Sequence, residues 1–260
     1  MSKRKIKLSR VSAIHYAKLV FRSLLLLVAA VLYFSRKSVD FLFESDGATR
    51  AVLAFIWLVF ALEIVLRMFP SSLESMGCQK QFKRNYKPYP NDPTPINQTG
   101  IVTFSVFAAW VALNAIIGIL YFADIIDKGA LLLISLGYSV CDMICILFFC
   151  PFQTLMLKNR CCATCRIYNW DYSMMFTPLI LIPNVFAISL FAMSFLLLLK
   201  WEITYKKHPE RFYSSTNECL SCANCREKLC AHKVQLKYFW RTEYEIIKKL
   251  KGKIIKPKKE

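Results

Sequence analysis

Apolar residues in this chain gather in long unbroken runs rather than at the spaced positions of a soluble helix or strand. The runs cover residues 16–33, 49–69, 101–122, 130–157 and 172–201, and the last contains Pro178 and Pro183. About 20 apolar residues in a helix span the roughly 30 Å hydrocarbon layer of a membrane and satisfy their own backbone hydrogen bonds there. The pattern therefore predicts an all-α, polytopic transmembrane helix bundle with four clear spans and a proline-interrupted fifth.

Polar segments separate these runs and define the predicted organisation. The loop 70–100 is rich in proline and asparagine, which exclude a long helix. The short turn ADIIDKG predicts an antiparallel hairpin between the third and fourth spans. We divide the chain into a membrane bundle, residues 1–201, which includes the Cys-rich loop 158–171, and a basic Cys-rich tail, residues 202–260.

The net charge of +18 is concentrated at the two ends of the chain. Residues 1–18 carry six Lys or Arg and no acid, and residues 200–260 carry sixteen against seven acids. Basic segments beside apolar spans are typical of anchoring against anionic lipid, which we favour over nucleic acid binding. Residues 233–253 also have the spacing of a basic amphipathic helix, which would lie on an anionic leaflet or pack on the protein itself.

The distribution of Lys and Arg also predicts the topology. The positive-inside rule places the N-terminus, the loop 70–100 and the loop 158–171 in the cytoplasm. Five crossings would then put the basic tail outside, against the same rule. We favour a cytoplasmic tail, because the prolines of the fifth run allow a re-entrant or interfacial piece in place of a single crossing.

Eleven cysteines, several in CxxC groups, indicate metal binding or redox chemistry more than a disulfide framework. The segment NECLSCANCREKLCAHK holds the densest group. Cys222, Cys225, Cys230 and His232 would make a Cys3His zinc site. Alternatively, Cys219 joins the other three cysteines in a Cx2Cx2Cx4C run, which resembles iron–sulfur ligand spacing without the usual last interval or the following proline. The absence of any metal is a third interpretation.

The loop motif RCCATCR contributes three more thiols, Cys161, Cys162 and Cys165. Flanking arginines, Arg160 and Arg166, favour the thiolate form. Three ligands are one short of a closed metal site, so a water or the tail would supply the fourth. Ordinary free thiols, or a redox-active Cys162–Cys165 pair, are the other interpretations of this motif.

A polar stripe marks one face of the fourth span. Its members are Ser135, Tyr138, Ser139, Asp142 and Cys145. A carboxylate at that depth needs a partner or water, and the expected partners are Arg22 and Arg67, the second of which is also four residues from Glu63. We favour a structural ion pair between helices over a proton or ion path. Cys141, Cys145 and Cys150 are interpreted as small packing residues.

The motifs NRCCATCRIYNWDYSMMFTPL, KWEITYKKHPERF and CANCREKLCAHK resemble an uncharacterised family of small polytopic bacterial membrane proteins. The resemblance covers the fourth span to about residue 235. It implies a bacterial inner-membrane location and the same Cys-rich elements, and it implies no activity.

Three functional hypotheses follow from these patterns. In the first, a cytoplasmic Cys/His zinc site joins the loop 158–171 to the tail in a structural or interaction role. In the second, the protein is a membrane redox protein with an iron–sulfur cluster or a reactive dithiol. In the third, it is a small transporter that uses Asp142.

Overall fold

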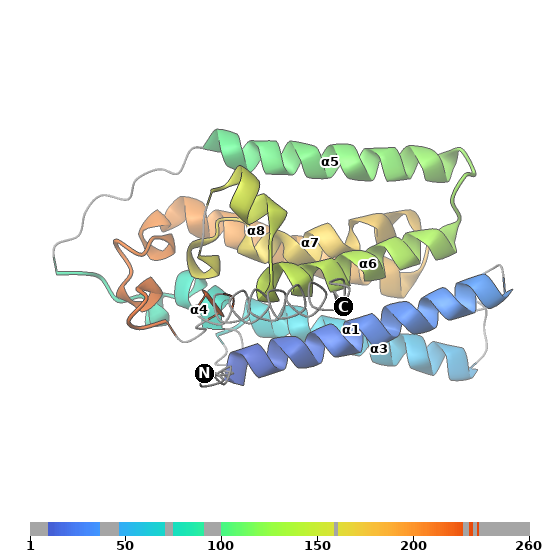
Figure 1. Cartoon of the computed structure of the whole chain (residues 1–260), viewed down its shortest axis with the longest axis horizontal. Coiled ribbons are helices and arrows are strands. Elements are labelled where there is room, and N and C mark those ends of the chain that lie inside the picture. The colour runs from blue at the N-terminus through green and yellow to red at the C-terminus, as the bar shows by residue number, and fades with distance from the viewer. Residues whose placement is uncertain are drawn as a thin grey trace, which may run out of the picture.

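The computed structural model describes residues 10–36, 47–70, 75–90, 100–158, 161–225, 229, 230 and 233. Helices form the architecture of this part of the chain (Figure 1). They are α1 (Arg10–Arg36), α3 (Gly47–Met68), α4 (Ser75–Gln81), α5 (Gly100–Phe122), α6 (Lys128–Leu147), α7 (Asp171–Phe176) and α8 (Val185–Lys207). Within the described ranges, β pairing is limited to one isolated bridge between Pro88 and Asn217. The predicted all-α class is confirmed.

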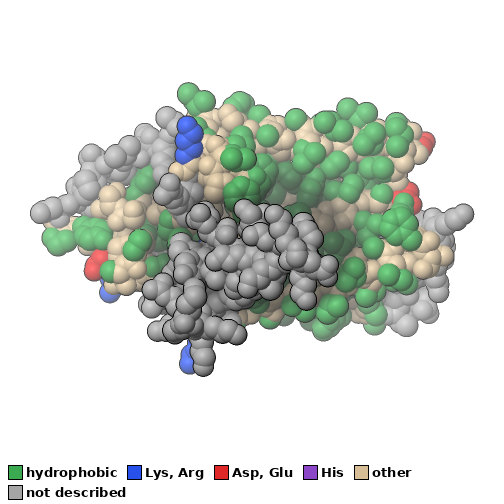
Figure 2. Space-filling view, viewed as in Figure 1, with side chains coloured by type: hydrophobic (Ala, Val, Ile, Leu, Met, Phe, Trp, Pro, Cys, Tyr) green, Lys and Arg blue, Asp and Glu red, His purple; other side chains and the backbone are tan. Residues whose placement is uncertain are grey.

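Five of these helices, α1, α3, α5, α6 and α8, are long and apolar enough to cross a membrane. Many of their large apolar side chains point outward, as do Phe34, Ile101 and Val185, each more than three-quarters exposed. Figure 2 shows hydrophobic side chains over much of the visible described surface. Such a surface is unfavourable in water and favourable in lipid, so the protein is a membrane-embedded helical bundle.

Helix α6 is shorter than the sequence predicted. It ends at Leu147, whereas the apolar run continues to residue 157. The reason is Pro151, which has no backbone N–H and whose ring would clash with the carbonyl four residues earlier, that of Leu147. One π-helical turn, η2 (Phe152–Met156), follows the proline. The predicted extension of the fourth span was therefore wrong.

The fifth apolar run divides into two antiparallel parts. Helix α7 and the 3-10 helix η5 (Thr177–Leu181) form the first, and α8 begins after Pro183 with Asn184 as its N-cap. Asp171 contacts Arg67 near the C-terminal end of α3, whereas Phe186 packs against Trp57 nearer its N-terminal end.

The chain therefore runs along the bundle and back between residues 171 and 207. This return explains how the start of α1 and the end of α8 come to lie at the same end of the bundle, the left end in Figure 1. A single crossing by the fifth run would have separated the two ends of the bundle domain. The side of the membrane on which this common end lies stays a prediction.

The polar segments at that end fold against one another into what we call the polar cap, residues 75–90, 161–170 and 208–225. The ring of Trp201, at the end of α8, packs on Phe212 with centroids 4.8 Å apart. Leu220 and Leu229 belong to the same buried cluster as Cys162. The tail thus packs on the Cys-rich loop through apolar side chains.

Candidate functional site

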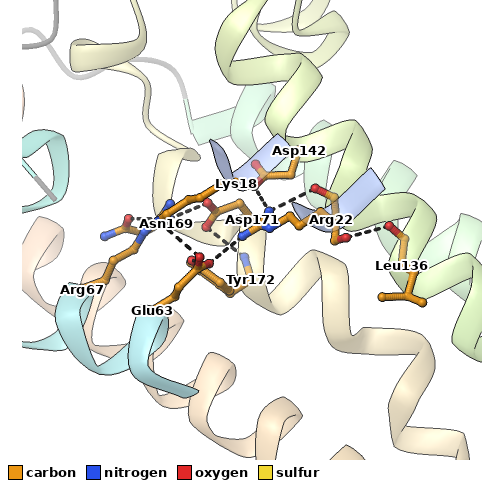
Figure 3. Close-up of polar contacts among 10 residues, drawn as sticks. Lys18, Arg22, Glu63, Arg67, Leu136, Asp142, Asn169, Asp171 and Tyr172 are labelled. Carbon is orange, nitrogen blue, oxygen red and sulfur yellow. Dashed lines mark hydrogen bonds and ion pairs between the residues drawn. The ribbon is translucent and has the colours of Figure 1, made fainter. Parts of the chain in front are cut away.

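Arg22 of α1 is the centre of a buried ion-pair network between helices (Figure 3). Its Nη1 donates to Asp142 Oδ2 on α6 at 3.0 Å and to the carbonyl of Ser139 at 3.0 Å. Its Nη2 donates to Glu63 Oε2 on α3 at 2.8 Å. Glu63 also accepts from the hydroxyl of Tyr172 at 2.7 Å. A fully buried arginine is tolerated in a bundle because carboxylates and a carbonyl replace its water.

Arg67 forms a second branch of this network near the polar cap. Its Nη1 donates to Asp171 Oδ2 at 2.5 Å and lies 3.5 Å from Asn169 Oδ1. Its guanidinium also lies over the ring of Tyr172, 4.5 Å from the centroid. Of the two arginines expected beside Asp142, the structure places Arg22 there and directs Arg67 to Asp171.

Two cysteines near the end of α6, Cys145 and Cys150, line the same cavity, and we call them the inner pair. The backbone N–H of Gln153 points at Cys150 Sγ, at 3.4 Å. The hydrogen bond from Cys145 lowers the pKa of Cys150 to about 7, against the opposing effect of partial burial. Cys150 is therefore the thiol of this pair that ionises near neutral pH.

Loop and tail contribute the outer pair, Cys161 and Cys230. The Cys230 thiol donates to the sulfur of Cys161, so segments 69 residues apart in sequence meet at their thiols. This hydrogen bond lowers the pKa of Cys161 to about 5. The hydrogen bond to Cys161 and, after it, burial raise the pKa of Cys230 above its ordinary range. One member of the outer pair is thus a thiolate and the other a thiol at neutral pH.

Lysines rather than the flanking arginine carry the positive charge beside the remaining loop thiols. Lys233 Nζ lies 3.4 Å from Cys162 Sγ, and Lys80 Nζ donates to the carbonyl of Cys165 at 3.1 Å. Burial lowers the pKa of Lys80 to about 8 and raises that of Cys165 to about 12. Arg166 instead pairs with the carboxylate of Glu202, and Arg160 lies outside the described residues.

The tail cysteines beyond the outer pair lie near the surface of the polar cap. Asn217 anchors this turn by accepting from the backbone N–H of Cys219 at 3.2 Å. Cys222 is exposed, and Cys225 is half-buried. His232 lies outside the described residues. Among those that are described, no group of three or more His, Cys, Asp or Glu could hold a metal ion; zinc and the iron–sulfur cluster both stay predictions.

A cavity of about 280 Å³ lies between α5, α6, η2, the Cys-rich loop and α7. Its lining is almost wholly apolar and includes the inner pair together with Cys162 and Cys165. Asp142 also reaches its wall, so the ion-pair network and the thiols share one cavity. In Figure 2 the visible face recedes below α5.

Sequence reasoning did not assign a functional role to three groups at this site. Cys145 and Cys150 were interpreted as packing residues, and Gln153 was not singled out. A signal was nevertheless present, because Cys150 directly precedes the proline that ends the helical run. A cysteine beyond the end of a helix can direct its thiol toward a neighbouring residue, whereas the preceding helical turn restricts the side-chain rotamers of a cysteine inside a helix.

Comparison of the chain with protein-family models, with curated proteins and with solved structures gives no match. The resemblance to bacterial membrane proteins therefore stays a prediction.

Proposed function

We propose that this protein is a membrane-embedded thiol–disulfide redox protein whose reactive groups are the inner and outer pairs. One observation carries the proposal: four thiols gather as two neighbouring pairs, the inner pair on the wall of one cavity and the outer pair where the tail packs on the Cys-rich loop. A thiol that accepts a hydrogen bond from a second thiol has both a stabilised thiolate and a resolving partner. That combination is what a reversible dithiol needs.

The chemistry at the outer pair is thiol–disulfide exchange. The Cys161 thiolate attacks one sulfur of a substrate disulfide, and the other substrate sulfur leaves as a thiolate. Cys230 then attacks the mixed disulfide. The substrate departs as a dithiol, and the protein retains a Cys161–Cys230 disulfide. Two electrons pass from protein to substrate in this direction, and the reverse sequence oxidises a dithiol.

The test is to equilibrate the purified full chain in detergent with buffers of reduced and oxidised dithiothreitol. Thiols are then blocked, and disulfide-linked peptides are mapped by mass spectrometry. We expect Cys161–Cys230 and Cys145–Cys150 linked peptides that appear and disappear reversibly with the poise of the buffer. Cys230→Ser should abolish the first link. Its matched control, Cys222→Ser, removes an exposed thiol of the same tail and should leave both links unchanged.

Absence of both linked peptides at every ratio of reduced to oxidised dithiothreitol would overturn the proposal.

A second candidate, zinc binding, is favoured by the same meeting of loop and tail at Cys161 and Cys230. One equivalent of zinc after anaerobic purification, with thiols that resist oxidation until a chelator is added, would support that candidate instead.

A further inference from the structure

The cavity beside the inner pair has the features of a site for a lipophilic ligand. Its volume of about 280 Å³ is close to the lower limit of the ~300–1,000 Å³ that ligand pockets occupy. Trp110 and Tyr138 form an edge-to-face ring pair at its wall, with centroids 5.1 Å apart. An apolar, aromatic lining of this kind suits a flat ring system better than a polar metabolite.

Helix α5, which carries a large exposed apolar surface, contributes to the wall of the cavity. Helix α5 forms one wall and contributes only Val106 and Ile117 as buried residues within its range. Several of its other large side chains, Phe104 and Ile116 among them, are exposed. A loosely packed helix between the cavity and the hydrocarbon layer favours a ligand that is dissolved in the membrane.

The side-chain amide nitrogen of Gln153, Nε2, is a hydrogen-bond donor without a partner in the described part of the structure. The side chain is 4% exposed and lines the cavity. Its Oε1 accepts from the Cys162 thiol at 3.5 Å, whereas its Nε2 has no hydrogen-bond partner among the described residues. A buried amide donor left in this state costs free energy unless a ligand accepts from it. The expected ligand therefore carries a carbonyl or similar acceptor.

From these observations we infer that the cavity binds a membrane quinone, which exchanges two electrons with the Cys145–Cys150 pair. A quinone combines a flat apolar ring, a carbonyl for Gln153 Nε2 and the capacity to accept two electrons beside a dithiol. In the net step the two thiols lose two protons and two electrons, and a sulfur–sulfur bond forms between Cys145 and Cys150. The two quinone oxygens gain those protons and electrons, which yields the quinol. The inference rests on the proposed redox function and names its membrane-side partner.

The experiment mixes the prereduced full chain in detergent, under anaerobic conditions, with decylubiquinone. This benzoquinone is fully substituted, so its ring offers no open carbon to which a thiol could add. We expect one quinol per chain to form together with a Cys145–Cys150 disulfide, measured by quinone absorbance and by peptide mapping. Cys145→Ser and Cys150→Ser should each abolish quinol formation, whereas Cys141→Ser should leave it unchanged.

Gln153→Met tests the hydrogen bond to the quinone with little change in side-chain volume. Loss of one such bond should raise the quinone KM by about tenfold and leave oxidation by diamide intact. Gln81→Met is the matched control, since Gln81 is a buried glutamine of α4 in the polar cap and does not line the cavity. An unchanged KM in Gln153→Met would overturn the assigned contact.

The two proposals fail in distinguishable ways. If diamide forms the Cys145–Cys150 disulfide but decylubiquinone neither binds nor oxidises the pair, the quinone inference is wrong and the thiol redox function stands. Binding of phospholipid acyl chains alone would have the same meaning. If neither oxidant links any pair, the redox function itself is wrong. Quinol formation by Cys145→Ser and Cys150→Ser would also refute the inference.

Discussion

The ion-pair network reaches α6 at Asp142, and the inner pair reaches it at Cys145, about one helical turn further on. The two regions differ in the chemistry of their side chains. Arg22 is buried among two carboxylates and a carbonyl, and Glu63 receives a further hydrogen bond from Tyr172. The thiols of the inner pair instead line an almost wholly apolar cavity. Opposite charges in contact favour a structural role, and neighbouring thiols beside a cavity favour chemistry.

The comparison also separates the interpretations of Asp142. A transporter would need a carboxylate that is free to bind and release an ion or a proton. The 3.0 Å contact with Arg22 instead supports the structural ion pair that the sequence analysis favoured. Asp142 also lines the cavity, beside Cys145 of the inner pair.

Removal of Arg22, the cation at the centre of the ion-pair network, should have the largest effect on stability. Arg22→Met leaves Glu63 and Asp142 buried without their shared partner, so we expect the free energy of unfolding to fall by about 3–5 kcal/mol. The measurement is unfolding of the detergent-solubilised protein by sodium dodecyl sulfate, followed by circular dichroism. Arg50→Met, which removes an exposed arginine of α3, is the matched control. Equal midpoints for the two variants would show that the network is not structural.

A substitution in the inner pair should have a smaller effect, which is seen in the pH dependence of Cys150 reactivity. Cys150 has a pKa of about 7 because Cys145 donates to it, against an ordinary value of 9.0. Cys145→Ala removes that donor, so the pKa should rise toward the ordinary value and less thiolate should be present at pH 7. Alkylation of Cys150 by N-ethylmaleimide across a pH series, read by mass spectrometry, should therefore shift its midpoint upward. The same midpoint in Cys145→Ala and in its control, Cys141→Ala, would contradict the pairing.

The smallest effect is expected where the network loses one neutral donor. Tyr172→Phe removes the hydroxyl that donates to Glu63 but keeps the ring beneath Arg67. Since Glu63 retains Arg22, we expect a loss of about 0.5–1.5 kcal/mol in the free energy of unfolding. The same detergent unfolding assay measures it, with Tyr121→Phe on α5 as the control. A loss as large as that of Arg22→Met would mean that the hydroxyl, rather than the guanidinium, holds the helices together.

Much of the helical architecture could be predicted, because a run of about 20 apolar residues has few alternatives in a membrane. The boundaries at proline were less predictable. Pro151 ended α6 early, and Pro183 separated a short return from α8. Hydropathy cannot distinguish one interrupted span from a return and a span, since both are apolar throughout. Only the packing of α7 and η5 against α6 and α8 decides between them.

The candidate site was predicted in kind but not in arrangement. The sequence analysis expected a meeting of loop and tail, and Cys161 lies against Cys230. Thiol activation was expected from Arg160 and Arg166. Arg166 binds Glu202, Arg160 lies outside the described residues, and Lys80 and Lys233 lie beside the thiols. Spacing within a motif specifies which thiols are neighbours along the chain. It carries no information on which distant lysine packs beside them.

Sequence by itself determined that this protein is a helical bundle in a membrane, with most of its net charge and its CxxC cysteines in the polar segments. Apolar runs and local spacing are properties of the chain, and the hydrocarbon layer acts on each run separately. Tertiary structure alone decided that Arg22 joins Asp142 to Glu63, that Cys145 pairs with Cys150 and that Gln153 faces a cavity. Each of these contacts requires segments to be placed relative to one another, which depends on side-chain packing between helices and not on the pattern along any one of them.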